Sequence, residues 1–129
     1  MRKNKYNILV TAIGGDIGQG IAKILRRLDF VGRIAGADLS SDNPHSRFVD
    51  SFYVVPAATD KDYLKKLEEI ISIEKAEFVI PVSEPELKVV WDAKNNLGWE
   101  PARLVMPGGL ALPLCLDKFD TMEFLKKQG

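Results

Sequence analysis

The chain has 129 residues, and 18 Lys and Arg balance 18 Asp and Glu, so its formal net charge is zero. This length predicts a single domain. The neutral charge argues against nucleic acid or an anionic membrane as a partner, because both are bound through an excess of cations. The single cysteine excludes an intrachain disulfide framework and a cysteine-based zinc site. We expect a cytoplasmic protein without a membrane-spanning segment, since no apolar run reaches the roughly 18 residues that such a helix needs.

Short apolar runs, bounded by turn residues, predict the strands. They lie at 6–12, 33–38, 51–55, 78–80 and 103–106. The first helix follows the first strand, and its apolar residues recur at helical spacing. They are Ile17, Ile21, Ile24, Leu25 and Leu28.

Capping residues predict where the later helices begin. Thr59 or Asp60 is suited to cap the second helix. Ser83 and Glu86 form a capping box for the third, with Pro85 in its first turn. Asp117 begins a last helix that runs towards Gln128. Strands that alternate with helices predict an α/β fold. We expect a three-layer Rossmann-like domain, with a mostly parallel sheet of about five strands and helices on both faces.

A glycine turn joins the first strand to the first helix, in the segment from Gly14 to Gly20. Glycines there let a phosphate approach the backbone, and Asp38, at the end of the second strand, has the position of a ribose-binding acid. This pattern is compatible with a stand-alone module that binds NAD(P) or another nucleotide. However, the glycine spacing differs from the dinucleotide pattern. We therefore favour the other interpretation, a structural turn that lets the helix pack on the sheet.

The remaining chemistry-bearing residues are scattered along the chain. His45 lies in a polar segment and is interpreted as a solvated loop residue, and Cys115 as a buried structural thiol. Glu84 and Glu86 follow the fourth strand and therefore lie at the ligand-binding edge of the sheet. Capping and the helix dipole account for both without a ligand. We identify no metal site and no catalytic residue.

Four motifs follow one another along nearly the whole chain. They are Ile17-Gly18-Gln19, then Asp38 with Val49-Asp50 and Tyr53-Val54-Val55-Pro56, then Phe78 to Leu87, and finally Asp117-Lys118 with Thr121, Leu125 and Gly129. Because these motifs occur in this order, the sequence resembles the N-terminal, pre-ATP-grasp domain of ATP-grasp ligases. The resemblance is in particular to the carbamoyl-phosphate synthase large-subunit type. The resemblance implies an ATP-dependent ligase, in which ATP phosphorylates a carboxylate and an amine or other nucleophile attacks the acyl phosphate.

The resemblance also implies roles for individual residues. Gly14, Gly15, Gly18, Asp38 and Glu84 become candidates for the acceptor-substrate side of the cleft. Lys118 becomes a candidate contact for ATP, whose Mg²⁺ would be held by acidic residues of the catalytic lobes.

The same resemblance implies how the chain is divided into domains. Residues 1–116 form the Rossmann-like domain, and residues 117–129 open a truncated ATP-grasp domain. We expect this chain to be catalytically inactive by itself and to bind no cofactor. Its partners would be a small carboxylate or amine substrate and the missing C-terminal ATP-grasp domain. The apolar segment from Leu110 to Leu116 would pack on that domain or on a second copy, in a homodimer.

Overall fold

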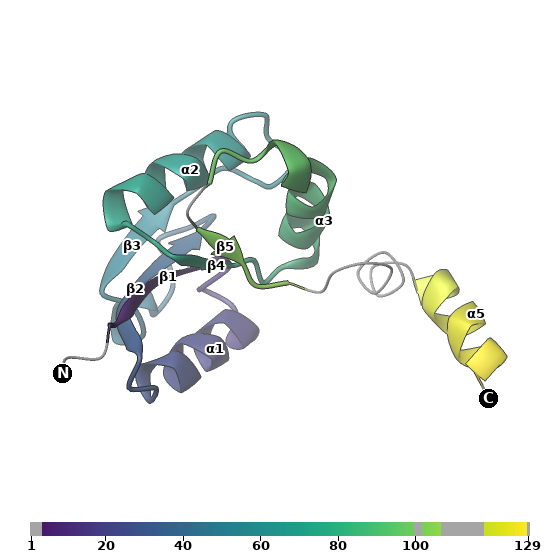
Figure 1. Cartoon of the computed structure of the whole chain (residues 1–129), viewed down its shortest axis with the longest axis horizontal. Coiled ribbons are helices and arrows are strands. Elements are labelled where there is room, and N and C mark those ends of the chain that lie inside the picture. The colour runs from purple at the N-terminus through teal and green to yellow at the C-terminus, as the bar shows by residue number, and fades with distance from the viewer. Residues whose placement is uncertain (1–3, 100–101, 107–117, 129) are drawn as a thin grey trace.

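The computed structural model describes residues 4–99, 102–106 and 118–128, and Figure 1 shows their arrangement. The strands are β1 (Tyr6–Val10), β2 (Val31–Asp38), β3 (Ser51–Val54), β4 (Phe78–Ile80) and β5 (Arg103–Leu104). The helices are α1 (Asp16–Arg26), α2 (Tyr63–Glu74), α3 (Glu84–Ala93) and α5 (Lys118–Gln128), with short 3₁₀ turns at His45–Arg47 and Lys94–Asn96.

The five strands form one sheet in the order β3-β2-β1-β4-β5, and every neighbouring pair is parallel. At its centre Val10 lies opposite Gly36 of β2 and Ile80 of β4. Helix α1 covers one face of the sheet, whereas α2 and α3 cover the other (Figure 1). The expected three-layer Rossmann-like α/β fold is therefore confirmed.

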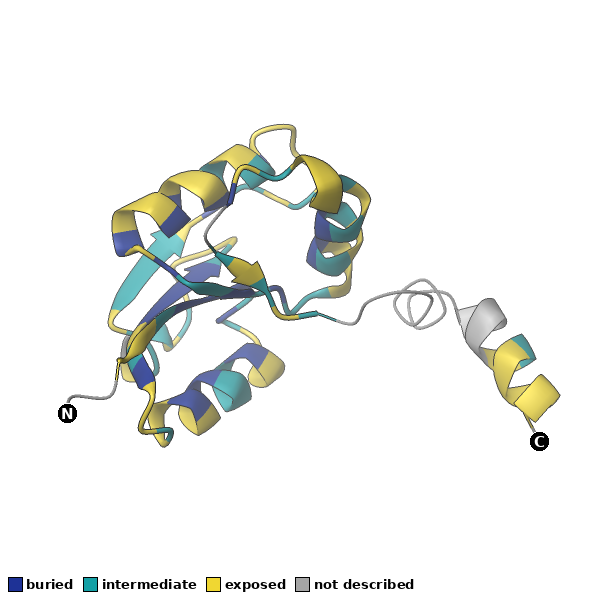
Figure 2. Ribbon diagram, in the orientation of Figure 1, coloured by how far each residue is buried: buried dark blue, intermediate teal, exposed yellow. Residues whose placement is uncertain are grey.

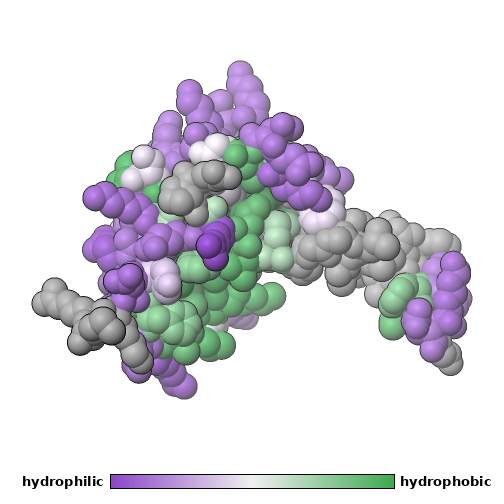
Figure 3. Space-filling model, in the orientation of Figure 1, coloured by the Kyte–Doolittle hydropathy of each residue, from purple (hydrophilic) through white to green (hydrophobic). Residues whose placement is uncertain are grey.

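Two hydrophobic cores lie on opposite faces of the sheet, because side chains alternate along each strand. Leu9 of β1 contributes to the core under α2 and α3, together with Leu67 and Val90. Its neighbours Ile8 and Val10 contribute to the core under α1. Figure 2 shows the buried residues on the sheet and on the inner sides of these helices. In Figure 3 hydrophilic atoms cover α2 and α3.

The buried face of α1 differs from the expected one. Gly18, Ala22 and Leu25 are its buried residues, whereas Ile17 and Ile24 are 69% and 63% exposed. The helix lies so close to the preceding turn that its small residues face the sheet, and the two isoleucines are consequently turned outward. The prediction of an apolar face that includes Ile17 and Ile24 was wrong for this reason.

Several element boundaries differ from the expected ones by one or two residues, because β2 begins at Val31, β3 ends at Val54 and β5 ends at Leu104. The first strand ends at Val10 rather than Ala12, since Ala12 has a φ of 49° and already belongs to the turn. The N-cap residue of α2 is Asp62 rather than Thr59 or Asp60, and its side chain makes no capping hydrogen bond. The Asp60 carboxylate instead accepts a hydrogen bond from the Asp62 N–H at 2.8 Å.

The capping box of α3 is confirmed, with Ser83 at the N-cap and Glu86 as its partner. Expectations for residues 110–116, including Cys115, and for Asp117 fall outside the described residues. Within the described segments, every helix is too short or too polar to cross a bilayer.

Candidate functional site at the carboxyl edge of the sheet

The carboxyl ends of the parallel strands meet at one edge of the sheet. There, β1 leads through α1 to β2 on one side, and β4 leads through α3 to β5 on the other. Loops that leave neighbouring strands in opposite directions flank the crevice in which open α/β sheets bind their ligands. The candidate site therefore lies beside the loops that follow β1, β2 and β4.

The glycine turn after β1 is shaped by close backbone packing. A Cβ on Gly18 would lie only 2.4 Å from the carbonyl oxygen of Ala12, so α1 approaches the turn as only glycine permits. Gly15 is the N-cap residue of α1, in an extended conformation. Gln19 donates from its side-chain Nε2 to the Gly14 carbonyl at 2.9 Å. Gly18 thus has the structural role that the sequence left open for it, whereas a Cβ on Gly15 would make only an ordinary contact of 3.7 Å with the Ala12 carbonyl oxygen.

Two of the predicted site residues are in direct contact. The Gly14 N–H donates to the Asp38 carboxylate at 2.7 Å. A side chain at position 14 would also meet Asn43, whose Nδ2 lies 3.0 Å from the position of a Cβ. The loop after β2 therefore closes over the glycine turn. Asn43 was missed at the sequence level, because only the fold brings its loop to Gly14.

A buried polar cluster, formed by Thr11, Tyr63 and Glu86, ties the turn after β1 to the start of α3. The Thr11 hydroxyl donates to the Glu86 carboxylate at 2.6 Å and accepts the Val82 N–H at 3.0 Å. The same Glu86 oxygen accepts the Ser83 N–H at 3.2 Å. Glu86 thus caps α3 and also fastens β1 to the β4–α3 turn. The first role could be predicted from the sequence. The second was not predicted, although a threonine at the end of an apolar strand is a signal for it.

The third member of the cluster, Tyr63, is completely buried at the first position of α2. Burial raises the pKa of its hydroxyl far above the ordinary value of 10.0, and the nearby Glu86 carboxylate raises it further. The hydroxyl therefore stays protonated. It makes no hydrogen bond to any part of the chain that the structure describes.

The other predicted site residues lie apart from this contact. Glu84 is exposed at the first position of α3, at the same edge of the sheet. Between 4 and 99, neither a hydrogen bond nor an ion pair joins it to Asp38. Lys118 is the first residue of α5, and its side chain falls outside the described part of the structure.

His45 is not the solvated loop residue that its polar surroundings indicate. It begins a 3₁₀ turn, is partly buried, and stacks its ring on that of Phe52, with centroids 3.7 Å apart and planes at 13°. Its Nδ1 is buried and finds no hydrogen-bond partner in the described segments. The ring packs against β3 because the loop after β2 folds back onto this edge strand.

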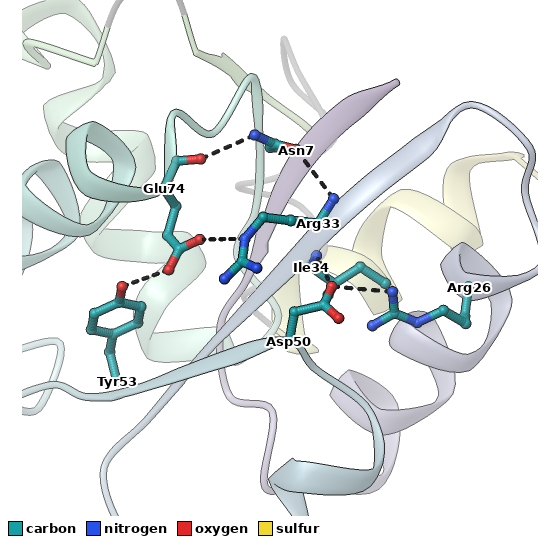
Figure 4. Close-up of polar contacts among 7 residues, drawn as sticks. All are labelled: Asn7, Arg26, Arg33, Ile34, Asp50, Tyr53 and Glu74. Carbon is teal, nitrogen blue, oxygen red and sulfur yellow. Dashed lines mark hydrogen bonds and ion pairs between the residues drawn. The ribbon is translucent and has the colours of Figure 1, made fainter. Parts of the chain in front are cut away.

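At the opposite, amino edge of the sheet, a second polar cluster joins α2 to three strands (Figure 4). The Glu74 carboxylate accepts hydrogen bonds from the Tyr53 hydroxyl at 2.5 Å and from Arg33 Nε at 3.3 Å. Asn7 donates from its side chain to the Glu74 carbonyl and accepts the Arg33 N–H. This cluster lies far from the ligand edge and stabilises the fold.

Glu74 makes the stability of the domain dependent on pH. Burial alone would raise the pKa of this carboxyl, but the hydroxyls of Ser51 and Tyr53 and the Arg33 guanidinium outweigh it, so the pKa lies below the ordinary value of 4.5. The stabilisation is complete above the unfolded pKa and is lost as the pH falls through the lower, folded pKa. We expect Glu74→Gln to flatten the acid part of the dependence of unfolding free energy on pH.

Urea unfolding measured at several pH values between about 3 and 6 tests this expectation. Glu69→Gln, on the same helix but exposed, is the control for loss of one carboxylate. Asp50, whose pKa is also lowered, accepts hydrogen bonds from Arg26 and the Ile34 N–H (Figure 4) and leaves some acid dependence in the variant. Identical pH profiles for Glu74→Gln and Glu69→Gln would contradict the assignment.

The described residues contain no group of three or more His, Cys, Asp or Glu side chains placed to hold a metal ion. The charged residues of the glycine turn and of the end of β2 beside it are the carboxylates Asp16 and Asp38.

Fold and site together define a class: a Rossmann-like α/β domain with a glycine turn and an acidic residue at the switch point of its sheet. Residues 8–99 match the family described as "PylC-like, N-terminal domain". The chain belongs to this family. The expected N-terminal domain of ATP-grasp enzymes is therefore confirmed. A search of curated proteins finds no match.

Similar solved structures agree with this assignment at the level of the fold. Glycinamide-RNase-transformylase T from Mycobacterium tuberculosis has a TM-score of 0.65 and 15% identity, over 95% of this chain and 35% of that one. N5-carboxyaminoimidazole synthetase from Staphylococcus aureus has a TM-score of 0.60 and 20% identity, over 98% and 32%. The biotin carboxylase domain of a thermophilic 2-oxoglutarate carboxylase has a TM-score of 0.62 and 14% identity, over 95% and 28%. The chain spans about a third of the length of these proteins.

Proposed function

We propose that this domain forms the acceptor-substrate side of an ATP-dependent carboxylate–amine ligase, which resembles the large subunit of carbamoyl-phosphate synthase. The observation that carries the proposal is the family match over residues 8–99, on a fold that joins Gly14 and Asp38 at the ligand edge. In such a ligase the carboxylate takes the γ-phosphoryl group of ATP and releases ADP. The amine then attacks the acyl carbon, and phosphate leaves.

Within this proposal each predicted residue has a role. Gly14, Gly15, Gly18, Asp38 and Glu84 form the acceptor side of the cleft. Lys118 contacts ATP, which is held with Mg²⁺ by an ATP-grasp domain that begins near residue 117. The 129-residue chain alone is inactive, and the whole protein is cytoplasmic. A homodimer through the segment 110–116 is part of the same proposal.

The first test concerns the gene and the isolated chain. We expect the reading frame to continue past Gly129 for roughly 180 residues or more, about the size of a further domain. Isothermal titration of the 129-residue chain with NADH, NADPH and ATP is expected to show no binding. Micromolar binding of NADH or NADPH would instead support a stand-alone dinucleotide-binding module and contradict the proposal.

The second test separates the two sides of the cleft in the whole protein. With phosphate release as the assay, Asp38→Ala is expected to raise the KM of the acceptor on the order of tenfold, the effect of losing one charged hydrogen bond, and to leave the KM of ATP unchanged. Lys118→Ala is expected to do the reverse. Asp42→Asn, in the same loop as Asp38, is the matched control. An Asp38 variant that raises only the KM of ATP would contradict the assignment.

A further inference from the structure

Three successive N–H groups of the glycine turn, those of Ile13, Gly14 and Gly15, are occupied within the chain. In a turn that cradles phosphate, successive N–H groups are free to point at the anion. Here the Ile13 N–H donates to the Ala37 carbonyl at 3.1 Å, and the Gly15 N–H to the Ala12 carbonyl at 3.2 Å. The N–H between them, that of Gly14, donates to Asp38 Oδ2 at 2.7 Å. None of the three is available to a ligand.

The Asp38 carboxylate also fills the space beside Gly14. A Cβ built on Gly14 would be 2.8 Å from Asp38 Oδ2, so this oxygen stands where an incoming phosphate oxygen would have to go. The loop that follows β2 holds it there. Asp38 Oδ1 accepts the Ser40 N–H at 3.4 Å, and Asn43 donates to the Ser40 carbonyl at 2.6 Å.

The negative charge of the surrounding segments also disfavours a phosphate beside Gly14. Segments 11–16, 38–44 and 80–86, which follow three neighbouring strands, contain five carboxylates and neither Lys nor Arg. They are Asp16, Asp38, Asp42, Glu84 and Glu86. A phosphate placed at Gly14 would therefore lose the hydrogen bond and also meet like charge.

We infer that Asp38 is a specificity-determining residue that keeps phosphate away from Gly14 in the glycine turn, because its carboxylate occupies the Gly14 N–H. A ligand that binds beside this turn is consequently free of phosphate at that point. The inference rests on the proposed function only in taking this edge as the acceptor side.

Amide NMR of the 129-residue chain, titrated with sodium pyrophosphate at constant ionic strength, tests the inference. In the wild type we expect no saturable shift of the Ile13, Gly14 and Gly15 amides. Asp38→Ala frees the Gly14 N–H and removes the charge, so its amides are expected to shift with saturation. The apparent affinity should rise on the order of tenfold or more, as for removal of one like charge beside an anion.

Two further variants serve as a fallback and as a control for charge. Asp38→Asn keeps the shape of the side chain if the alanine variant does not fold, and should give a smaller gain. Asp42→Asn removes the same charge from the same loop without touching Gly14, and should behave as the wild type. Saturable shifts in the wild type overturn the inference. So does an equal gain in Asp42→Asn, or no gain in the folded Asp38 variants. None of these results depends on whether the whole protein is a ligase, which the phosphate-release assay decides separately.

Discussion

Replacing Gly18 with alanine is expected to lower the free energy of unfolding by about 1–3 kcal/mol, the usual range for overpacking a close-packed site. The new Cβ would lie 2.4 Å from the Ala12 carbonyl oxygen and 3.0 Å from the Ile13 Cα. Both are backbone atoms of the turn, so no side chain can move aside to make room. The overlap can be relieved only by moving α1 or the turn, which would also loosen the contacts of Ala22 and Leu25 with the sheet.

Gly20→Ala is the matched control, because it lies in the same helix and nothing stands within 4 Å of a Cβ there. Alanine favours a helix over glycine by about 0.5–1 kcal/mol, so this variant is expected to be slightly stabilised. Urea unfolding followed by far-UV circular dichroism measures both variants. Equal unfolding midpoints for Gly18→Ala and Gly20→Ala would show that close packing at Gly18 does not stabilise the fold.

Replacing Thr11 with valine is expected to cost about 2–4 kcal/mol, the sum of a lost hydrogen bond to a charged group and an unpaired buried N–H. Valine keeps the shape of the side chain but removes its hydroxyl. Glu86 then loses its 2.6 Å donor, and the Val82 N–H loses its acceptor at 3.0 Å. Since Thr11 is fully buried and Glu86 only 7% exposed, water does not readily replace either bond.

Thr11→Ser is the control, because it keeps the hydroxyl and removes only the methyl group. It is expected to cost about 1 kcal/mol, the value for one buried methyl group. The difference between the urea midpoints of the two variants isolates the contribution of the hydroxyl. If valine and serine destabilise the domain equally, the hydrogen bonds between Thr11 and the β4–α3 turn are not what holds the two together.

The candidate site was predictable only where local sequence determines local structure. The Ser83–Glu86 capping box was predictable because both partners lie within one helical turn. The contact of Glu86 with Thr11 joins residues 75 positions apart, and that of Gly14 with Asp38 joins residues 24 apart. Such pairs depend on which strands are neighbours. That Asp38 follows the second strand could be predicted, but that its carboxylate turns onto Gly14 could not.

The amino-acid sequence by itself determined the class of fold, the site edge and the family resemblance. It did so through features that act over short distances: the apolar period of each strand, the glycine turn and the helix caps. Only the tertiary structure decided how α1 is rotated and what the glycine turn can bind. Gly18 packs on Ala12 and thereby turns Ile17 and Ile24 away from the sheet, against their apolar pattern. Asp38 takes the N–H that a phosphate would need, since β2 lies directly beside β1.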